Sequence, residues 1–145
     1  MDAKPSTYDG HPWIWTKRHD FTKDQLGSNT GEWLLYPATK DADECWEKVR
    51  QATILGELGI LAKVSTALRA NKFWKAEIRV ICVYTHDCSD TDDVRRVGMA
   101  IARLGWQKAS YKTTADTRAG KYAVPGRNPI SKFALRDGQV VDVSG

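Results

Sequence analysis

The chain has 145 residues, 41% of them hydrophobic and 28% charged, which fits one globular domain and argues against a disordered chain. No apolar run is long enough for a membrane span, and the polar start DAKPSTYDG lacks a signal-peptide pattern, so we expect cytoplasmic residence. The three cysteines form no CxxC pair, which indicates neither a disulfide framework nor a zinc knuckle. The net charge of +4 lies entirely in residues 106–145.

Residues 1–30 are rich in turn formers and aromatic side chains and show no sustained period. We expect them to wrap over a single α+β domain formed by residues 31–145. The run EWLLYP, from Glu32, is short, apolar and ends at a proline, which predicts a strand. Apolar residues at helical spacing and an acidic first turn then predict a helix over residues 41–54.

The segment ILAKVST predicts a second strand, and AEIRVICVYT predicts a central one because both of its faces are mostly apolar. Asp90 is a suitable N-cap for a helix over residues 91–104, which Gly105 ends. WQKASYKT can form a further strand, and GRNP a turn. The last segment, KFALRDGQVVDV, predicts a hairpin around Asp137 and Gly138.

Two helices therefore serve about six strands, and several connections are too short for parallel crossovers. We infer a mostly antiparallel sheet with both main helices on one face. The other face is left for the N-terminal segment or for a ligand.

Six tryptophans are a high count for this length. Trp46 lies on the apolar face of the first helix and is assigned to the core. An exposed indole offers a flat face on which a nucleobase can stack, and the candidates for this role are Trp13, Trp15 and Trp33. Alternatively, these indoles pin the N-terminal segment onto the sheet.

The stretch YKTTADTRAGKY, residues 111–122, combines hydroxyls, cations and a glycine, which suits a phosphate or carboxylate. It lacks the GxxxxGK[ST] pattern of a P-loop. The alternative is a basic surface loop. With the nearby basic side chains it supplies the ligand-binding candidates Lys112, Thr117, Arg118, Lys121, Tyr122 and Arg127.

Lys63 and Arg79 lie inside predicted strands with apolar neighbours, so each is either paired with a carboxylate or directed at a ligand. The histidines lack metal-ligand spacing, and we expect neither a metal nor a cofactor. His86, beside Asp87, could act as an acid or base or simply form a turn. No hydrolase signature is present.

Four pieces of the chain resemble, in order, the family of basophilic-leukaemia-expressed-like proteins: GEWLLY, CWEKVRQAT…GELGILAKVST, IRVICVYTHDCSD and YKTTADTRAGKY. The resemblance runs from about Gly31 to Asn128. This family is similar in fold to the mRNA cap-binding translation initiation factor, which implies a curved antiparallel sheet with helices behind it. In cap-binding relatives a base stacks between tryptophans, an acidic side chain reads its edge, and arginine and lysine hold the phosphates. The resemblance assigns no particular tryptophan pair here.

These patterns favour a binding protein that holds a phosphorylated small molecule, a nucleotide or an RNA end on the concave sheet face. One alternative is an enzyme acting on a phosphate ester, such as a phosphothreonine-lyase-like eliminase, with Lys63 or Lys112 as the base. Another is a protein-interaction module. The sequence leaves the oligomeric state open.

Overall fold

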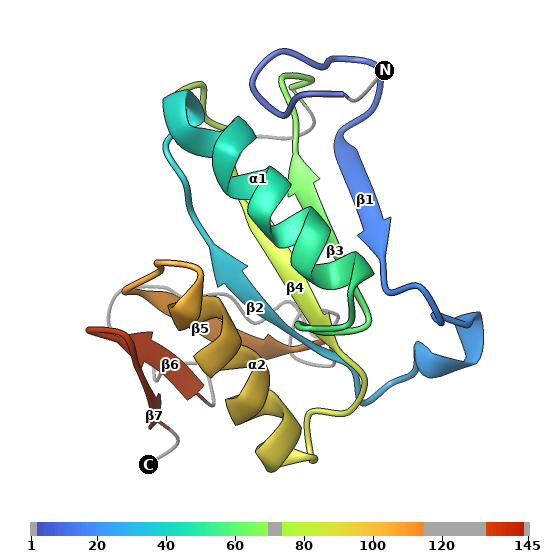
Figure 1. Ribbon diagram of the computed structural model, residues 1–145. Helices are drawn as coiled ribbons and strands as arrows, with labels where there is room; N and C mark the ends of the chain where they lie inside the picture. The colour runs from blue at the N-terminus through green and yellow to red at the C-terminus, as the bar shows by residue number, and fades with distance from the viewer. Residues whose placement is uncertain (1–2, 70–73, 115–132, 144–145) are drawn as a thin grey trace.

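The computed structural model describes residues 3–69, 74–114 and 133–143, and from β2 onward its elements follow the predicted order (Figure 1). The strands are β1 (Trp13–Lys17), β2 (Gly31–Leu35), β3 (Leu61–Ser65), β4 (Ile81–Thr85), β5 (Ala109–Thr113), β6 (Phe133–Arg136) and β7 (Gln139–Asp142). The helices are η1 (Lys23–Gln25), α1 (Thr39–Ile54) and α2 (Thr91–Arg103). The predicted GRNP turn lies outside the described residues.

The seven strands form one sheet in the order β1-β3-β4-β2-β5-β6-β7, and every pair is antiparallel. This confirms the predicted sheet and places β4 near its middle. Strand β1 was not predicted. Residues 13–17 belong to the sheet as an edge strand rather than to a covering segment, while Ser6 fastens the preceding residues to α1 by donating to Asp43.

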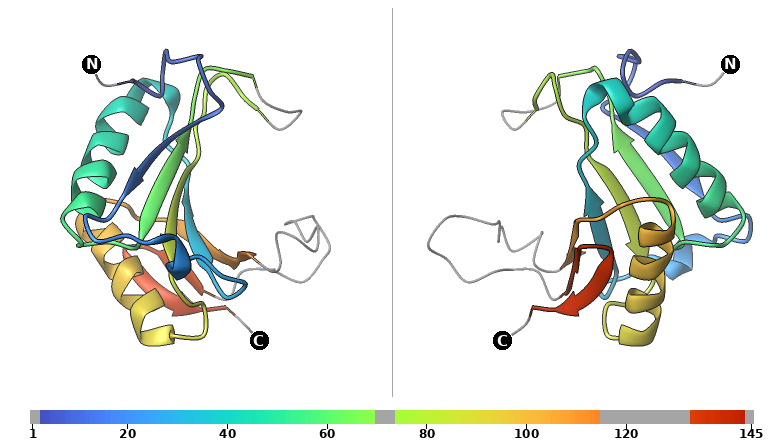
Figure 2. Two further views of the ribbon diagram at one scale, coloured as in Figure 1. Left: turned by 90° about the vertical axis from the view of Figure 1, so that its right-hand side faces the viewer. Right: turned by 60° about the vertical axis from the view of Figure 1, so that its left-hand side comes forward.

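Both long helices cover the same face of the sheet, as predicted (Figure 2). Helix α1 buries Ala42, Trp46 and Val49, whose spacing of three or four residues forms one apolar stripe. Helix α2 begins where the Asp90 side chain accepts a hydrogen bond from the amide of Asp93. The helices therefore leave the opposite face of the sheet without helical cover.

The core lies between the helices and the covered face of the sheet. Its strand residues include Trp33, Leu35, Val83 and Tyr111, all fully buried. The backbone of Gly31 approaches this core closely, because a Cβ there would lie 2.0 Å from the Tyr111 hydroxyl oxygen. A side chain at Gly31 would therefore displace the Tyr111 ring.

The last two strands form the predicted hairpin. Asp137 and Gly138 have φ angles of 52° and 74°, the left-handed conformation that a two-residue type I′ turn needs at both central positions. An aspartate followed by glycine adopts this conformation readily.

Candidate functional site

The sheet face opposite the helices carries the aromatic and charged side chains of the candidate site. Strand pairing places Trp15 opposite Lys63, and Lys63 opposite Cys82. It also places Tyr84 opposite Glu32. Because alternate residues of a strand point to the same face, these side chains lie together on the open face of the sheet.

Lys63 lies among three aromatic rings. Its Nζ is 3.9 Å from the ring centroid of Trp13, 5.2 Å from that of Trp15 and 5.8 Å from that of Tyr84. Ammonium groups within about 6 Å of a ring centroid are attracted by the negative face of the ring. We call Trp13, Trp15, Lys63 and Tyr84 the aromatic–lysine cluster.

The cluster combines an accessible ring with a cation. Trp15 stacks beside Tyr84 at a centroid distance of 6.1 Å, yet 55% of its surface is exposed. Among the described residues no carboxylate forms a salt bridge with Lys63. The cluster therefore offers an indole on which a planar group can stack and, beside it, an ammonium that an anion can pair with.

A buried carboxylate lies next to the cluster. Glu32 is only 7% exposed, and its Oε1 is 3.8 Å from the Nζ of Lys112. Its Oε2 is buried and has no hydrogen-bond partner among the described residues. Buried polar atoms are nearly always hydrogen-bonded, so a donor from an ordered water or a bound ligand would satisfy this oxygen.

Burial and the nearby carboxylate keep two neighbouring groups neutral. Burial raises the pKa of the Tyr84 hydroxyl well above its usual range, and the Glu32 charge adds to the effect. The pKa of the Cys82 thiol is raised for the same two reasons. Both groups remain protonated at neutral pH, so Cys82 is not a nucleophile and Tyr84 presents a neutral ring.

The structure brings together three of the residues predicted from the sequence, Trp13, Trp15 and Lys63. It does not join Lys63 to Lys112, because β4 and β2 separate their strands. Three strand spacings of about 4.8 Å put the two backbones about 14 Å apart on the same face. In the structure the two ammonium groups face different partners, Lys63 the Trp13 ring and Lys112 the Glu32 carboxylate.

Two predicted ligand contacts have structural roles instead. Trp33 is fully buried on the helix-covered face, where its Nε1 donates to the carbonyl of Val94, so it has no face on which a base could stack. Arg79 is also buried. Its guanidinium donates to the carbonyls of Pro5, Lys75, Ala76 and Ile78, so its hydrogen bonds fasten the backbone and do not reach an open surface.

The remaining candidates lie outside the described residues, and their role in an anion site stays a prediction. They are Thr117, Arg118, Lys121, Tyr122 and Arg127.

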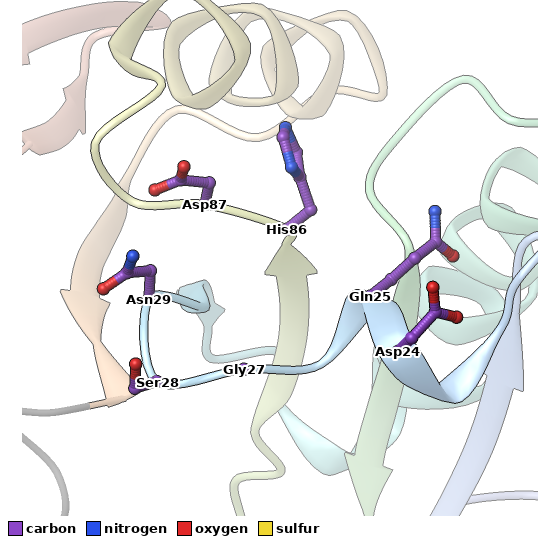
Figure 3. A pocket seen from close by; sticks show the side chains of 7 residues that line it. All are labelled: Asp24, Gln25, Gly27, Ser28, Asn29, His86 and Asp87. Atoms are coloured by element: carbon purple, nitrogen blue, oxygen red, sulfur yellow. The ribbon is translucent and has the colours of Figure 1, made fainter.

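A cavity of about 350 Å³ lies at another place, between the loop before β2 and the end of β4 (Figure 3). Its lining includes the carboxylates of Asp24 and Asp87 together with Ser28, Asn29 and His86. Lysine and arginine are absent from this lining. Two carboxylates repel a phosphate, so this cavity does not suit the anion predicted from the sequence.

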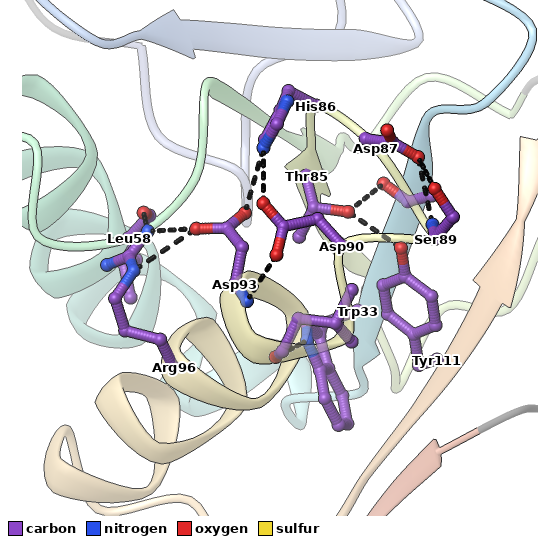
Figure 4. A network of polar contacts seen from close by, with 12 residues as sticks. Trp33, Leu58, Thr85, His86, Asp87, Ser89, Asp90, Asp93, Arg96 and Tyr111 are labelled. Atoms are coloured by element: carbon purple, nitrogen blue, oxygen red, sulfur yellow. Dashed lines mark hydrogen bonds and ion pairs between the residues drawn. The ribbon is translucent and has the colours of Figure 1, made fainter.

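His86 takes part in a polar network at the start of α2 (Figure 4). Its Nε2 lies 3.3 Å from Asp90 and 3.7 Å from Asp93, and Asp93 also accepts from Arg96. Arg96 in turn donates to the carbonyl of Leu58. These contacts tie the helix start to the preceding loop. His86 therefore has a structural partner in each of the two aspartates.

Sequence reasoning missed Tyr84 and Glu32 as members of this face. The signal was the alternation within each strand: Glu32 is the charged residue at the start of an otherwise apolar strand, and Tyr84 is two positions from Cys82. The described residues contain no group of three possible metal ligands. No helix in the described ranges has the length and apolar character to cross a membrane.

Comparison with protein families gives one match over most of the chain. A family model described as "Basophilic leukemia-expressed protein Bles03" matches residues 7–115, which include the whole aromatic–lysine cluster. A search of curated protein sequences found no match.

Solved structures with a similar fold include eIF4E proteins. A schistosome eIF4E complexed with m7GpppG and 4E-BP aligns with 92% of this chain and 75% of its own, at 13% identity and a TM-score of 0.67. A second schistosome complex, with m7GpppA and 4E-BP, covers 88% and 72% at 15% identity and a TM-score of 0.63. Eif4E-3 of Ascaris suum with an m2,2,7G cap covers 85% and 68% at 14% identity and a TM-score of 0.59. At these identities the likeness shows the fold.

Proposed function

The chain belongs to the Bles03 family and has the fold of the eIF4E proteins, and from its open sheet face we propose that it binds a phosphorylated nucleotide, free or at an RNA end. The base stacks on Trp15 and a phosphate pairs with Lys63. One observation carries the proposal: the exposed Trp15 ring borders an ammonium that no described carboxylate neutralises. The cap ligands in the eIF4E structures support the same class of ligand.

The physical chemistry of the cluster suits both halves of a nucleotide. Stacking of a base on an aromatic side chain contributes about 1–3 kcal/mol. A charge-assisted hydrogen bond from an ammonium to a phosphate adds about 1.5–3 kcal/mol. The Nζ of Lys63 lies 5.2 Å from the ring centroid of Trp15, so one nucleotide can stack its base on Trp15 and pair its phosphate with Lys63. Glu32 offers a nearby acceptor oxygen that has no hydrogen-bond partner among the described residues.

The test is a titration of the protein with GDP and with guanosine, followed by tryptophan fluorescence. Guanosine should bind more weakly, because it lacks the phosphates that Lys63 pairs with. Trp15→Leu and Lys63→Met should each weaken GDP binding by about 10- to 100-fold, as the loss of one stacked base or one charged hydrogen bond predicts. Added salt should weaken binding further, because partly exposed ion pairs are screened.

Lys40→Met is the matched control. Lys40 is an exposed lysine of α1, on the side of the sheet away from the cluster, so its removal changes the net charge equally without touching the site. GDP affinity should stay within about twofold of wild type in this variant, as for exposed charges farther away than a Debye length of about 8–10 Å. Equal affinity in wild type, Trp15→Leu and Lys63→Met would contradict the proposal.

A further inference from the structure

The open face already holds a positive charge among the rings on which a ligand would stack. Lys63 Nζ lies over the Trp13 ring at 3.9 Å and within 5.2 Å of the Trp15 centroid. In this position it occupies the electronegative ring faces that a cationic ligand would otherwise use. A cationic ligand that stacks on Trp15 must therefore come close to the Lys63 ammonium, which repels it.

A base stacked on Trp15 cannot avoid the field of Lys63. Aromatic pairs place their centroids about 4.5–7 Å apart, so a stacked base lies of order 10 Å or less from the ammonium. Salt largely screens exposed charges only when they lie farther apart than a Debye length of about 8–10 Å. Tyr84, which stacks beside Trp15 at 6.1 Å, further restricts where the base can lie.

Among the described strand residues of this face, positive charges outnumber negative ones. Glu32 is the carboxylate nearest the cluster, and its Oε1 already faces the ammonium of Lys112 at 3.8 Å. Lys17 follows Trp15 in β1 at the same phase of the strand and adds another positive charge to the open face. The field at the cluster is therefore positive, which attracts phosphates and repels a positively charged ring.

We infer that this site selects a phosphorylated nucleotide with an uncharged base, and that Lys63 is the residue that excludes a cationic base such as protonated 7-methylguanine. The inference rests on the proposed function and names the ligand class of that same site. It distinguishes this chain from the eIF4E structures of similar fold, whose ligands carry a methylated guanine.

The experiment compares GDP with 7-methyl-GDP, which carry the same phosphates and differ in the charge of the base. Both are titrated against the full chain at mildly acidic pH, where the methylated base keeps its positive charge. Wild type should bind GDP about 3- to 30-fold more tightly, the range expected for two like charges at this separation near a protein surface. Lys63→Met should weaken GDP binding and bring this ratio to about one or below.

Lys17→Met is the matched control for the ratio. It removes a positive charge from the same face without removing the ammonium from the rings, so it should weaken both ligands and lower their ratio clearly less than Lys63→Met does. If 7-methyl-GDP binds wild type as tightly as GDP or more tightly, the inference is wrong while the proposed function stands. An unchanged ratio in Lys63→Met also overturns it. If neither nucleotide binds wild type, both the proposed function and the inference fail.

Discussion

The two faces of the sheet use the same residue types, aromatic and polar side chains, in different ways. On the covered face Trp33 is fully buried, its Nε1 donates to Val94, and the Tyr111 hydroxyl lies 2.7 Å from the Thr85 hydroxyl. On the open face Trp15 is 55% exposed, and Lys63 has aromatic neighbours but no described ion pair. Polar groups are paired within the protein on one face and remain available on the other.

The comparison separates residues that hold the fold together from residues that are available for binding. A polar atom buried without a partner costs about 1–3 kcal/mol, and the covered face avoids that cost by pairing its hydroxyl and indole groups. The open face tolerates an unsatisfied oxygen on Glu32. Substitutions on the two faces should therefore affect different measurements.

The largest effect is expected for Trp33→Ala. The substitution removes a fully buried ring from the core and a hydrogen bond to α2, so the free energy of unfolding should fall by about 3–5 kcal/mol. Chemical denaturation monitored by circular dichroism measures it. Trp15→Ala on the open face should cost less than about 1 kcal/mol, as for an exposed side chain. Similar losses for both variants would erase the distinction between the faces.

A substitution at a purely apolar core position also tests whether stability and binding depend on different faces. Ile101 of α2 is fully buried against the sheet, so Ile101→Ala should lower the free energy of unfolding by about 2–5 kcal/mol. If the variant still folds, its GDP affinity should match wild type, because Ile101 lies on the far side of the sheet from the cluster. Loss of affinity in the folded variant would show that the two faces are coupled.

Alkaline pH probes the buried thiol of the open face. Burial holds the pKa of Cys82 above the usual thiol value of 9.0, so above that pH the unfolded chain releases a proton that the folded chain keeps. The free energy of unfolding should therefore decrease with rising pH, by about 1.4 kcal/mol per pH unit for each such group. Cys82→Ala should make the decrease between about pH 9 and 10 shallower. An identical slope in the variant would contradict this.

The smallest effect is expected for Tyr111→Phe. The change keeps the ring in the core and removes only the hydroxyl that bonds Thr85, so the cost should be about 1 kcal/mol. Thermal or chemical unfolding of the variant measures it. A cost above about 3 kcal/mol would show that the buried ring had moved as well.

Most of the fold could be predicted from the sequence because its signals are local. Helix α2 combines an N-cap, a regular apolar spacing and a terminal glycine, and β4 is a continuous apolar run. Strand β1 was missed because an edge strand with exposed Trp15 and Lys17 lacks such a run. The site was harder, since it depends on strand pairing between residues as distant as Trp15 and Lys63.

The tryptophan assignments show that the sequence does not predict which face of the sheet each side chain occupies. Trp33 follows Glu32 in one strand, and a shift of one residue exchanges the two faces of a sheet. The composition of the strand does not fix that phase, so Trp33 and Trp15 were assigned the same role. Lys63 was correctly placed in a strand as a cation beside apolar residues, but its aromatic neighbours come from two other strands.

The most direct test of the proposed binding face follows the indole N–H signals of all six tryptophans by two-dimensional ¹⁵N NMR, assigned by single substitutions, during a titration with GDP. The signals of Trp13 and Trp15 should shift with ligand concentration, whereas those of buried Trp33 and Trp46 should not. Lys63→Met should reduce the shifts at equal GDP concentration. Shifts confined to tryptophans other than Trp13 and Trp15, or no shifts at saturating GDP, would contradict binding on the open face.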